Sequence, residues 1–526
     1  MIRTKVKSEQ GTVNRIGHLL GGGLGLMLGL TLLVLVLRVA YVVLWHPYGL
    51  APDEAQYWSW LAHNDWSFLT KPPLTTWLMG VSTAVFGQTL LGVKAFALLG
   101  QAMVSVLGFV IVREIAGARG GWWAWVLLTT APLIAGGGLL MAPDAVLLPL
   151  WLGAMLAVVK AFRRDDARAL CWPRWLIIGV LIGLGGLAKY TAALFFPLLG
   201  AFLLVFKRHW LLRPQVWVSG LVALAFQLPV LIWNMQNDWV GIGHLLWQVD
   251  GGGDARHGGL ASFGEFVGGQ ALVLGPVVFV LGVFGLYRVM SGYVGLYRHD
   301  KVRVNAELGL LWVWWVAVAV LGAFAGLSFF SKVQANWPLL GSVAALLVLA
   351  VWLGHWKKRW VMGVAVAGVV LNSVLSLMLM DTYKARDMGL LPLKAKNDPT
   401  KDLRGWADMG NLMGVLLTKL DRPIVLSSRY QTLAPLMFHI PQGVAEYAYV
   451  NAEGRRLNQY DLWPLPDFSD RVVVYVNEQG HVPEKVSGMF GQCAPWHTLA
   501  VEEYEVVTRR MSLWVCWGAR VVADAQ

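Results

Sequence analysis

The sequence predicts a polytopic α-helical membrane protein that ends in a small domain of α/β or α+β type. Of its 526 residues, 57% are hydrophobic and only 14% are charged, whereas a soluble protein carries roughly 25% charged residues. Apolar runs near the ~20 residues needed to cross a bilayer recur up to residue 380. The composition then becomes mixed. This change predicts two domains, a transmembrane domain at 1–380 and a soluble domain at 381–526.

We expect about eleven membrane spans, because basic loops alternate with apolar runs and mark the cytoplasmic side. Basic residues before the first run place the N-terminus in the cytoplasm, and eleven spans then place the C-terminus outside. The apolar segment 74–87 is short and follows two prolines, so it is expected to lie along the interface or to re-enter. The spans are expected at about 16–45, 90–112, 121–140, 144–162, 175–188, 190–206, 214–233, 265–287, 306–328, 338–354 and 361–380.

The region after residue 380 has the pattern of a small domain with strands and helices. Strand-like runs occur at 423–427 and 471–476, with a predicted helix at 430–438 between them. Alternating stretches near 504–508 and 513–522 predict further strands. With the C-terminus outside, this domain is expected on the outer side of the membrane.

The three cysteines have different expected states. Cys171 lies in a basic loop expected in the cytoplasm, which favours a free thiol. Cys493 and Cys516 lie in the C-terminal region and can pair if that region is extracytoplasmic. The sequence leaves this disulfide open, because separation along the chain does not fix the distance between two residues in the fold.

Charged residues gather in loops that are predicted to lie outside, next to the membrane. Charges there cost free energy unless they are solvated or paired, so such a group indicates a functional site. A carboxylate suits a general base that deprotonates an acceptor hydroxyl or amine. A lysine suits a leaving phosphate, whose developing charge it stabilises. These parts fit sugar transfer from a lipid phosphate. The residues are Asp53, Glu54 and Lys71 in the first outer loop, and Asp144, Lys189 and Lys332 in later loops.

Each of these residues also has a simpler interpretation that the sequence leaves open. Asp53 and Glu54 fit solvated loop carboxylates, and Asp144 fits the N-cap of the next span. The lysines fit side chains that extend to lipid headgroups. Asn336, which precedes Trp and Pro, fits an ordinary turn.

Two other classes of function are not indicated. The net charge is +12, but the basic residues fall in short loops between spans, which is a topology signal and not a nucleic-acid footprint. The sequence has no Walker A motif, no GxGxxG in a strand–helix context and no zinc-finger cysteine spacing. No cofactor is therefore expected; a divalent metal is possible but not required.

Three short motifs give the chain a resemblance to a known family. At Asp53-Glu-Ala-Gln-Tyr-Trp58, Lys71-Pro-Pro-Leu74 and Met141-Ala-Pro-Asp144 it resembles the GT-C membrane glycosyltransferases. Within them it is similar to the branch of protein O-mannosyltransferases and the bacterial lipid A aminoarabinose transferase. The resemblance implies a catalytic aspartate at Asp53, a phosphate-contacting lysine at Lys71 and a second acidic residue at Asp144. It also implies a polyprenyl- or dolichyl-phosphate monosaccharide as donor. Thr70 stands where the aminoarabinose transferase has an acidic residue, which puts a metal site there in doubt.

Together these observations predict a GT-C type, inverting glycosyltransferase of the inner membrane. It moves one hexosyl or pentosyl unit from a polyprenyl phosphate to a lipid, glycan or protein acceptor on the periplasmic face. Asp53 is the expected general base and Asp144 assists, while the expected donor-phosphate residues are Lys71, Lys189 and Lys332. The expected acceptor- or substrate-binding residues are Glu54, Tyr57 and Asn336. Two alternatives remain: a transporter or flippase of lipid-linked sugars, and a non-catalytic subunit that binds a partner through its C-terminal domain.

Overall fold

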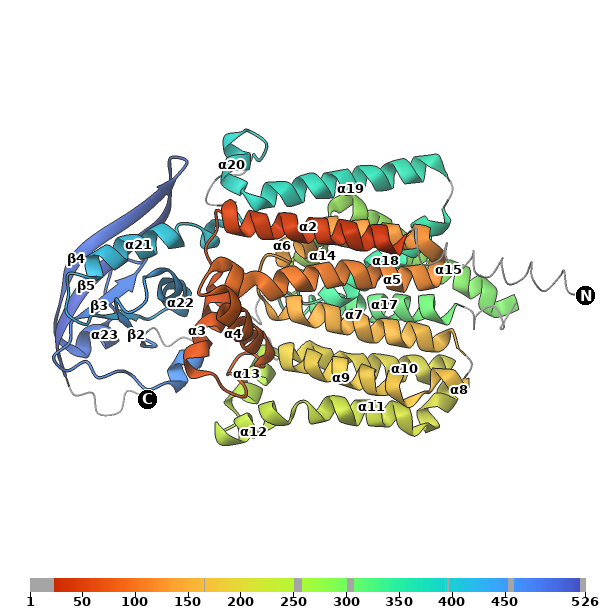
Figure 1. Ribbon diagram of the computed structural model, residues 1–526, viewed down its shortest axis with the longest axis horizontal. Coiled ribbons are helices and arrows are strands. Elements are labelled where there is room, and N and C mark those ends of the chain that lie inside the picture. Colours follow the sequence, from red (N-terminus) through yellow and green to blue (C-terminus); the bar gives the residue numbers. More distant parts are fainter. Residues whose placement is uncertain are drawn as a thin grey trace, which may run out of the picture.

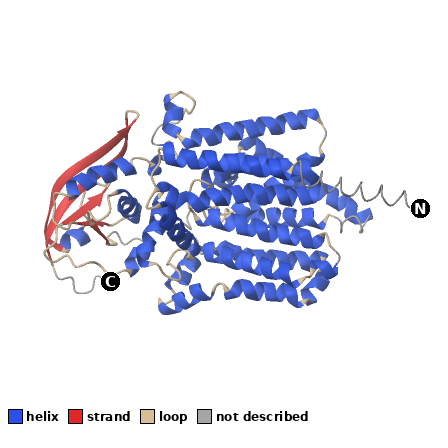
Figure 2. Ribbon diagram, viewed as in Figure 1, coloured by secondary structure: helices blue, strands red, loops and turns tan. Residues whose placement is uncertain are grey.

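The computed structural model of the protein has two parts, a helical bundle and a sheet-containing domain at one end of it (Figure 1). It describes residues 23–520 except 165, 250–257, 300–306, 357, 393, 395–396 and 453–457. The basic N-terminal residues and the beginning of the expected first span, at 16–22, lie outside the described residues. Figure 2 shows that the strands gather in the end domain and that the rest of the described chain is helix and loop.

The helical elements follow one another closely along the chain. They are α2 (Leu24–Leu44), α3 (Pro52–Ser59), α4 (Leu74–Phe86), α5 (Leu90–Thr130), α6 (Pro132–Gly137), α7 (Pro143–Phe162), α8 (Asp166–Ala169), α9 (Trp172–Ala188), α10 (Phe195–Phe206), α11 (Pro214–Ala225), α12 (Leu228–Gln236), α13 (Val240–Val249), α14 (Leu260–Leu274), α15 (Pro276–His299), α17 (Leu308–Leu327), α18 (Leu339–His355), α19 (Arg359–Met380), α20 (Thr382–Asp387), α21 (Trp406–Leu417), α22 (Tyr430–His439) and α23 (Glu484–Gly488).

The predicted fold class is confirmed, since the chain is a multi-pass helical membrane protein with a small C-terminal sheet domain. Among the described residues, five helices are long and apolar enough to cross a membrane: α2, α5, α7, α17 and α19. Two bent pairs, α11 with α12 and α14 with α15, raise this number to seven. The count of eleven spans and the side of the membrane on which each end lies stay predictions.

The long helix α5 is a hairpin of two helical arms that turn at Gly117. Gly117 has φ 77°, a left-handed conformation that glycine adopts without a Cβ clash. The arms run back against each other, since the Gln101 side chain donates to the Leu128 carbonyl at 3.0 Å and the Phe109 and Trp122 rings touch. The expected spans 90–112 and 121–140 correspond to these arms, although the second arm ends at Thr130.

The expected span 265–287 is wrong as a single straight helix. It is broken at Gly275 into α14 and α15, whose axes differ by 105°. Gly275 has φ +83°, and the Asn372 side chain donates to the Leu274 carbonyl at 2.7 Å. This carbonyl would otherwise lack a partner at the end of the helix. The expected span 214–233 is likewise bent, by 41° between α11 and α12.

The helix α18 forms the centre of the bundle. Every residue from Leu339 to Leu353 is buried, and α18 packs against α5, α15 and α17. Helices α2 and α19 lie at the periphery and expose leucine and valine side chains. In water such surfaces would be costly, but hydrocarbon solvates them.

The C-terminal domain contains one five-stranded sheet with the strand order β2-β1-β3-β5-β4. Strand β1 pairs in parallel with β2 and β3, whereas β5 pairs antiparallel with β3 and β4. The predicted strands at 423–427 and 471–476 and the helix at 430–438 are present as β1, β3 and α22. The strands are β1 (Ile424–Ser427), β2 (Glu446–Tyr449), β3 (Val473–Asn477), β4 (Phe490–Glu503) and β5 (Val506–Ala519). Cys493 and Cys516, opposite each other on β4 and β5, form a disulfide.

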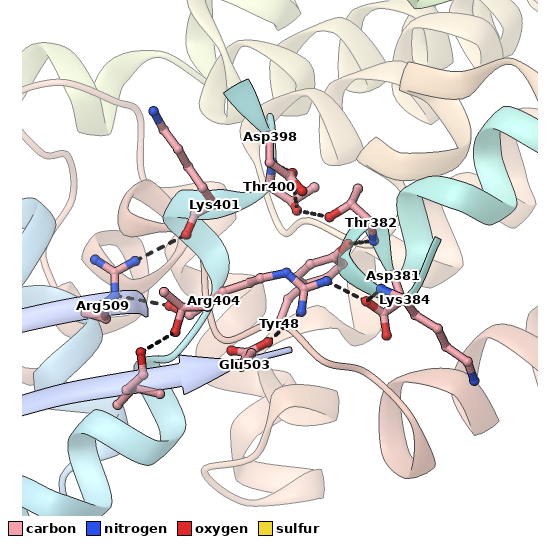
Figure 3. A network of polar contacts seen from close by, with 12 residues as sticks. Tyr48, Asp381, Thr382, Lys384, Asp398, Thr400, Lys401, Arg404, Glu503 and Arg509 are labelled. Carbon is pink, nitrogen blue, oxygen red and sulfur yellow. Dashed lines mark hydrogen bonds and ion pairs between the residues drawn. The ribbon is translucent and has the colours of Figure 1, made fainter. Parts of the chain in front are cut away.

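A buried arginine joins the C-terminal domain to the bundle (Figure 3). Arg404 donates to Asp381, which follows α19, at 2.5 Å and to Glu503 of β4 at 2.6 Å. Its guanidinium also lies over the rings of Tyr48 and Tyr383. A planar guanidinium can serve two carboxylates and two aromatic faces at once. This contact fixes the sheet relative to the ends of α2 and α19.

Candidate active site

The candidate site begins with α3, a segment that the sequence analysis expected to be a loop. Pro52 occupies the first helical turn, where its fixed φ favours helix and its missing N–H costs nothing. Asp53 and Glu54 follow in the same turn, where the positive end of the helix dipole favours carboxylates. The Glu54 carboxylate also accepts from the Ala51 backbone N–H at 3.2 Å. The short polar segment is therefore a helix that presents two acids.

A cavity of about 590 Å³ lies between the helical part and the C-terminal domain. Its wall combines apolar and aromatic side chains with several polar and charged groups, which is typical of small-molecule sites. The lining residues from the helical part include Asp53, Tyr57, Lys71, Lys189 and Trp337. The C-terminal domain contributes Ser428, Arg429, Tyr430, Gln431, Tyr449 and Asn458.

Asp53 faces this cavity and is bound by the C-terminal domain. The Tyr430 hydroxyl donates to its carboxylate at 3.0 Å, and α22 packs on α3. Asp53 remains exposed, so an incoming hydroxyl can reach it. Burial, followed by the charge of Asp53, raises the pKa of the Tyr57 phenol. Tyr57 is therefore a neutral hydroxyl on the wall beside a carboxylate.

Glu54 does not line the cavity, which differs from its expected role in substrate binding. Its side chain is 2% exposed and pairs with the fully buried Lys94 of α5 at 2.6 Å. It also accepts from the Met141 backbone N–H at 2.8 Å, and Lys94 donates to the Leu139 carbonyl at 3.0 Å. Glu54 thus ties α3 to α5 and to the segment that leads into α7.

Three expected residues from distant loops meet in one cluster. Lys189, after α9, donates to both carboxylate oxygens of Asp144 at 2.8 and 2.9 Å. Asn336, before α18, donates to the same carboxylate at 3.2 Å. Asp144 itself lies in the first turn of α7, directly after Pro143. The positive charge of Lys189 is balanced by Asp144, and Lys189 still reaches the cavity wall.

The other two expected lysines differ in position. Lys71 lies on the cavity wall beside Thr70 and Pro72. Lys332 does not line the cavity; its side chain is exposed and lies 4.0 Å from Glu265. Among the described residues, no group of three His, Cys, Asp or Glu is placed to hold a metal ion.

Sequence reasoning missed Lys94, Arg429 and Tyr430. A lysine inside an otherwise apolar span was the available signal for Lys94, since an intramembrane charge needs a partner. Arg429 and Tyr430 belong to the predicted strand–helix connection of the C-terminal domain, but nothing in the sequence indicates that this connection faces α3.

Comparison with known proteins confirms the resemblance of the chain to membrane glycosyltransferases of the GT-C type. Residues 70–233 match the model of the dolichyl-phosphate-mannose-protein mannosyltransferase family. A lipid A galacturonosyltransferase of Rhizobium johnstonii is 26% identical over 394 residues, which cover 73% of this chain and 76% of that protein. An undecaprenyl phosphate-alpha-4-amino-4-deoxy-L-arabinose arabinosyl transferase of Pseudomonas aeruginosa is 26% identical over 39% of this chain and 40% of that protein.

Solved structures share the fold over nearly the whole chain. The crystal structure of ArnT from Cupriavidus metallidurans bound to undecaprenyl phosphate aligns with a TM-score of 0.60 at 14% sequence identity. The alignment covers 94% of this chain and 99% of that one. The apo form of the same protein gives a TM-score of 0.59 at 15% identity.

Proposed function

We propose that this protein transfers one monosaccharide from a polyprenyl phosphate to an acceptor at the outer face of the inner membrane. The observation that carries the proposal is the cavity at the end of the bundle, with the carboxylate of Asp53 and the ammonium of Lys71 on one wall. A carboxylate base and a cation that line the same cavity suit a reaction that removes a proton and releases an anion. The names of the relatives support a lipid-linked sugar donor and lipid A as the acceptor.

In the proposed reaction Asp53 takes the proton of an acceptor hydroxyl. The acceptor oxygen then forms a bond to the anomeric carbon from the face opposite the phosphate. The bond from that carbon to the phosphate oxygen breaks, and the polyprenyl phosphate leaves with the electron pair. Lys71 offsets the additional negative charge on the phosphate. A single displacement of this kind inverts the configuration at the anomeric carbon.

The Asp144, Lys189 and Asn336 cluster is proposed to shape the acceptor side of the cavity. Because Lys189 is held by both oxygens of Asp144, its ammonium has a fixed position from which it can donate to a substrate oxygen. A fixed donor reduces the entropy lost when substrate binds. We infer that Asp144 acts through Lys189.

The C-terminal domain is proposed to lie in the periplasm. Its Cys493–Cys516 disulfide suits an oxidising compartment, since disulfides are rare in the cytosol. The lipid donor and the lipid acceptor would both reach the cavity at that face. No nucleotide is needed there, because the sugar arrives on a lipid.

The test is transfer by the purified protein in detergent, with a panel of radiolabelled polyprenyl-phosphate monosaccharides and lipid A. Asp53→Asn should lower the transfer rate by about 10²- to 10⁴-fold, because it removes a general base. The thermal melting temperature should not change, since Asp53 is exposed. The exposed Asp421 gives the control variant Asp421→Asn, which should keep full activity.

Full activity of Asp53→Asn would rule out Asp53 as the base. Donor that crosses a liposome bilayer without cleavage of the sugar–phosphate bond would instead identify a flippase.

A further inference from the structure

Arg429 lies on the wall that the C-terminal domain contributes to the cavity. It follows β1 and immediately precedes α22. Its backbone N–H donates to the Ser427 hydroxyl at 3.4 Å, and the Ser428 hydroxyl shares a 2.9 Å hydrogen bond with the Tyr475 hydroxyl. The next residue, Tyr430, donates to Asp53. Arg429 is therefore placed at the site by residues held on both sides of it.

The topology of the sheet directs this connection toward the cavity. Strands β1 and β2 run parallel, so their carboxyl ends share one edge of the sheet. Ligands of open α/β sheets bind at that edge. Residues after β1, from Ser428 to Gln431, and Tyr449 at the end of β2 all line the cavity. The edge where an α/β domain takes a ligand thus faces the proposed transferase site.

The guanidinium of Arg429 has unused hydrogen-bonding capacity. Its Nε is buried and has no hydrogen-bond partner in the described part of the chain. Buried polar groups in folded proteins almost always have partners, so such a group needs an explanation. The Nε–H and a neighbouring Nη–H of arginine form a planar fork that matches a carboxylate or a phosphate. A substrate oxyanion would complete this fork.

The donor phosphate is not the best match for this position. In the proposed function its polyprenyl chain would lie in the bilayer, which would keep the phosphate near the helical part, where Lys71 lines the cavity. The sugar and the acceptor headgroup extend farther from the bilayer, toward the wall supplied by the C-terminal domain. A negative charge on one of them would meet Arg429.

We propose that Arg429 binds a second substrate oxyanion, distinct from the donor phosphate. The proposal rests on the proposed transferase function and adds a determinant of substrate choice to it. Two sources share the required chemistry: the carboxylate of an acidic donor sugar and a phosphate of the acceptor lipid. Either one would be recognised by the same fork.

The experiment compares wild type and Arg429→Gln on two matched pairs of substrates. One pair is a polyprenyl-phosphate hexuronate and the corresponding neutral hexose. The other pair is lipid A with and without its phosphates. For the charged member of one pair, Arg429→Gln should raise KM by about tenfold or more, with kcat and melting temperature unchanged. For the neutral member, wild type and variant should agree. Arg429→Lys, which keeps the charge without the fork, should fall between them.

The control is Arg422→Gln, since Arg422 lies in the same domain, is largely exposed and does not line the cavity. It should behave as wild type. The pair that shows the KM effect identifies the source of the oxyanion. Equal KM values for Arg429→Gln and wild type on all four substrates, or equal losses on charged and neutral members, would overturn the proposal. Weaker binding of undecaprenyl phosphate itself would assign Arg429 to the donor phosphate and would also overturn it.

Failure of the proposed function would look different. Wild type would then transfer no sugar from any donor. Direct binding of the four substrates to wild type and Arg429→Gln would still test the second oxyanion site, because binding requires no turnover. Selective loss of one charged ligand would support it, and identical affinities would refute it.

Discussion

Asp53 and Glu54 are adjacent in the sequence but face different surroundings. Consecutive residues of an α-helix point about 100° apart, so one turn of α3 directs Asp53 to the cavity and Glu54 into the protein. The Asp53 carboxylate accepts a hydrogen bond from the Tyr430 hydroxyl, whereas the Glu54 carboxylate accepts one from the Lys94 ammonium. In the proposed function, Asp53 is the residue that meets the substrate and Glu54 is the residue that holds α3 in place.

The Glu54–Lys94 pair should be a strong determinant of stability. Both side chains are almost completely buried, and removal of one partner leaves an uncompensated charge, which costs about 3–5 kcal/mol. Glu54→Gln and Lys94→Met should each lower the melting temperature in detergent. The double variant should lose less stability than the two single variants lose together, because it leaves no unpaired charge.

The matched control is the exposed pair of Asp421 and Arg422, 3.9 Å apart. Asp421→Asn should change stability by less than about 0.5 kcal/mol. Strictly additive losses in the double variant Glu54→Gln/Lys94→Met would contradict the coupling.

His439 should make the stability of the C-terminal domain depend on pH. Burial, followed by the charge of Lys94, lowers its pKa from 6.5 to about 4. The folded protein thus binds this proton less tightly than the unfolded chain. Above about pH 7 the imidazole is neutral in both the folded and the unfolded chain, so the free energy of unfolding has its full value. As the pH falls from 6.5 toward 4 the unfolded chain takes up the proton first, and the free energy of unfolding decreases. The loss reaches about 3.5 kcal/mol at most, at ~1.4 kcal/mol per pKa unit.

The measurement is the melting temperature at pH 7.5 and pH 4.5. The difference between the two should be smaller in His439→Gln than in wild type. His497→Gln serves as control, because His497 lies in the same domain and is exposed. If the two melting temperatures differ by as much in His439→Gln as in wild type, His439 is not the cause of the pH dependence.

The sequence predicts site residues that lie in loops between membrane spans, but it does not predict contacts between the two domains. Alternating spans bring every second loop to one face, so Asp144, Lys189 and Asn336 were all expected there, and they form one cluster. Contacts between domains have no such periodic signal. Tyr430 reaches Asp53 across 377 positions of sequence, and only the packing of α22 on α3 determines that contact.

At the level of elements, the break between α14 and α15 should tolerate only glycine. A Cβ on Gly275 would lie 1.7 Å from the Asn372 Oδ1, and its φ is +83°. Gly275→Ala should therefore destabilise the protein by more than about 2 kcal/mol, from the clash and the left-handed backbone together. Thermal melting in detergent would measure this.

Gly282 provides a control in α15, the helix that follows the break, since a Cβ there would meet nothing within 4 Å. Gly282→Ala should be neutral or slightly stabilising. Equal melting temperatures for Gly275→Ala and Gly282→Ala would show that the break does not depend on glycine.

Periodicity predicted the elements well where the pattern was long, and poorly where a single residue interrupts it. The run through Gly275 did contain a signal of the break, the pair Gly275-Pro276, which is typical of a turn. The contact that completes the turn comes from Asn372, which is far away in the sequence. Strands β2 and β4 were not predicted. Strand β2 has only four residues, and β4 contains Pro495 and a register shift beside it, which disturb the alternation of a regular strand.

For the whole molecule, the important feature is that two domains form one cavity. The helical part supplies Asp53 and Lys71, and the C-terminal domain supplies Arg429 and Tyr430. The two domains also meet at the Ser59 and Tyr460 hydroxyls, 2.6 Å apart. Neither domain alone completes the site, so transfer should depend on how firmly they are joined.

Arg404 is the residue through which this dependence can be tested. It is fully buried and bridges Asp381 and Glu503, and it belongs to the network in Figure 3. Arg404→Gln would leave two carboxylates close together without their cation. We expect the contact between the two domains to lose about 3–5 kcal/mol of stabilising free energy. Proteolysis of the chain after Met380 should become faster, and the transfer rate should fall at least tenfold. Arg404→Lys should be intermediate, since an ammonium lacks the planar fork.

The informative comparison is Arg471→Gln, because Arg471 pairs with Glu446 at 2.8 Å within the C-terminal domain and not across the junction. That variant should leave proteolysis after Met380 and transfer unchanged. If Arg404→Gln is cleaved faster and yet transfers sugar at the wild-type rate, the C-terminal domain does not form part of the working site. In that case the residues that it contributes to the cavity, Arg429 and Tyr430, would have no role in the reaction.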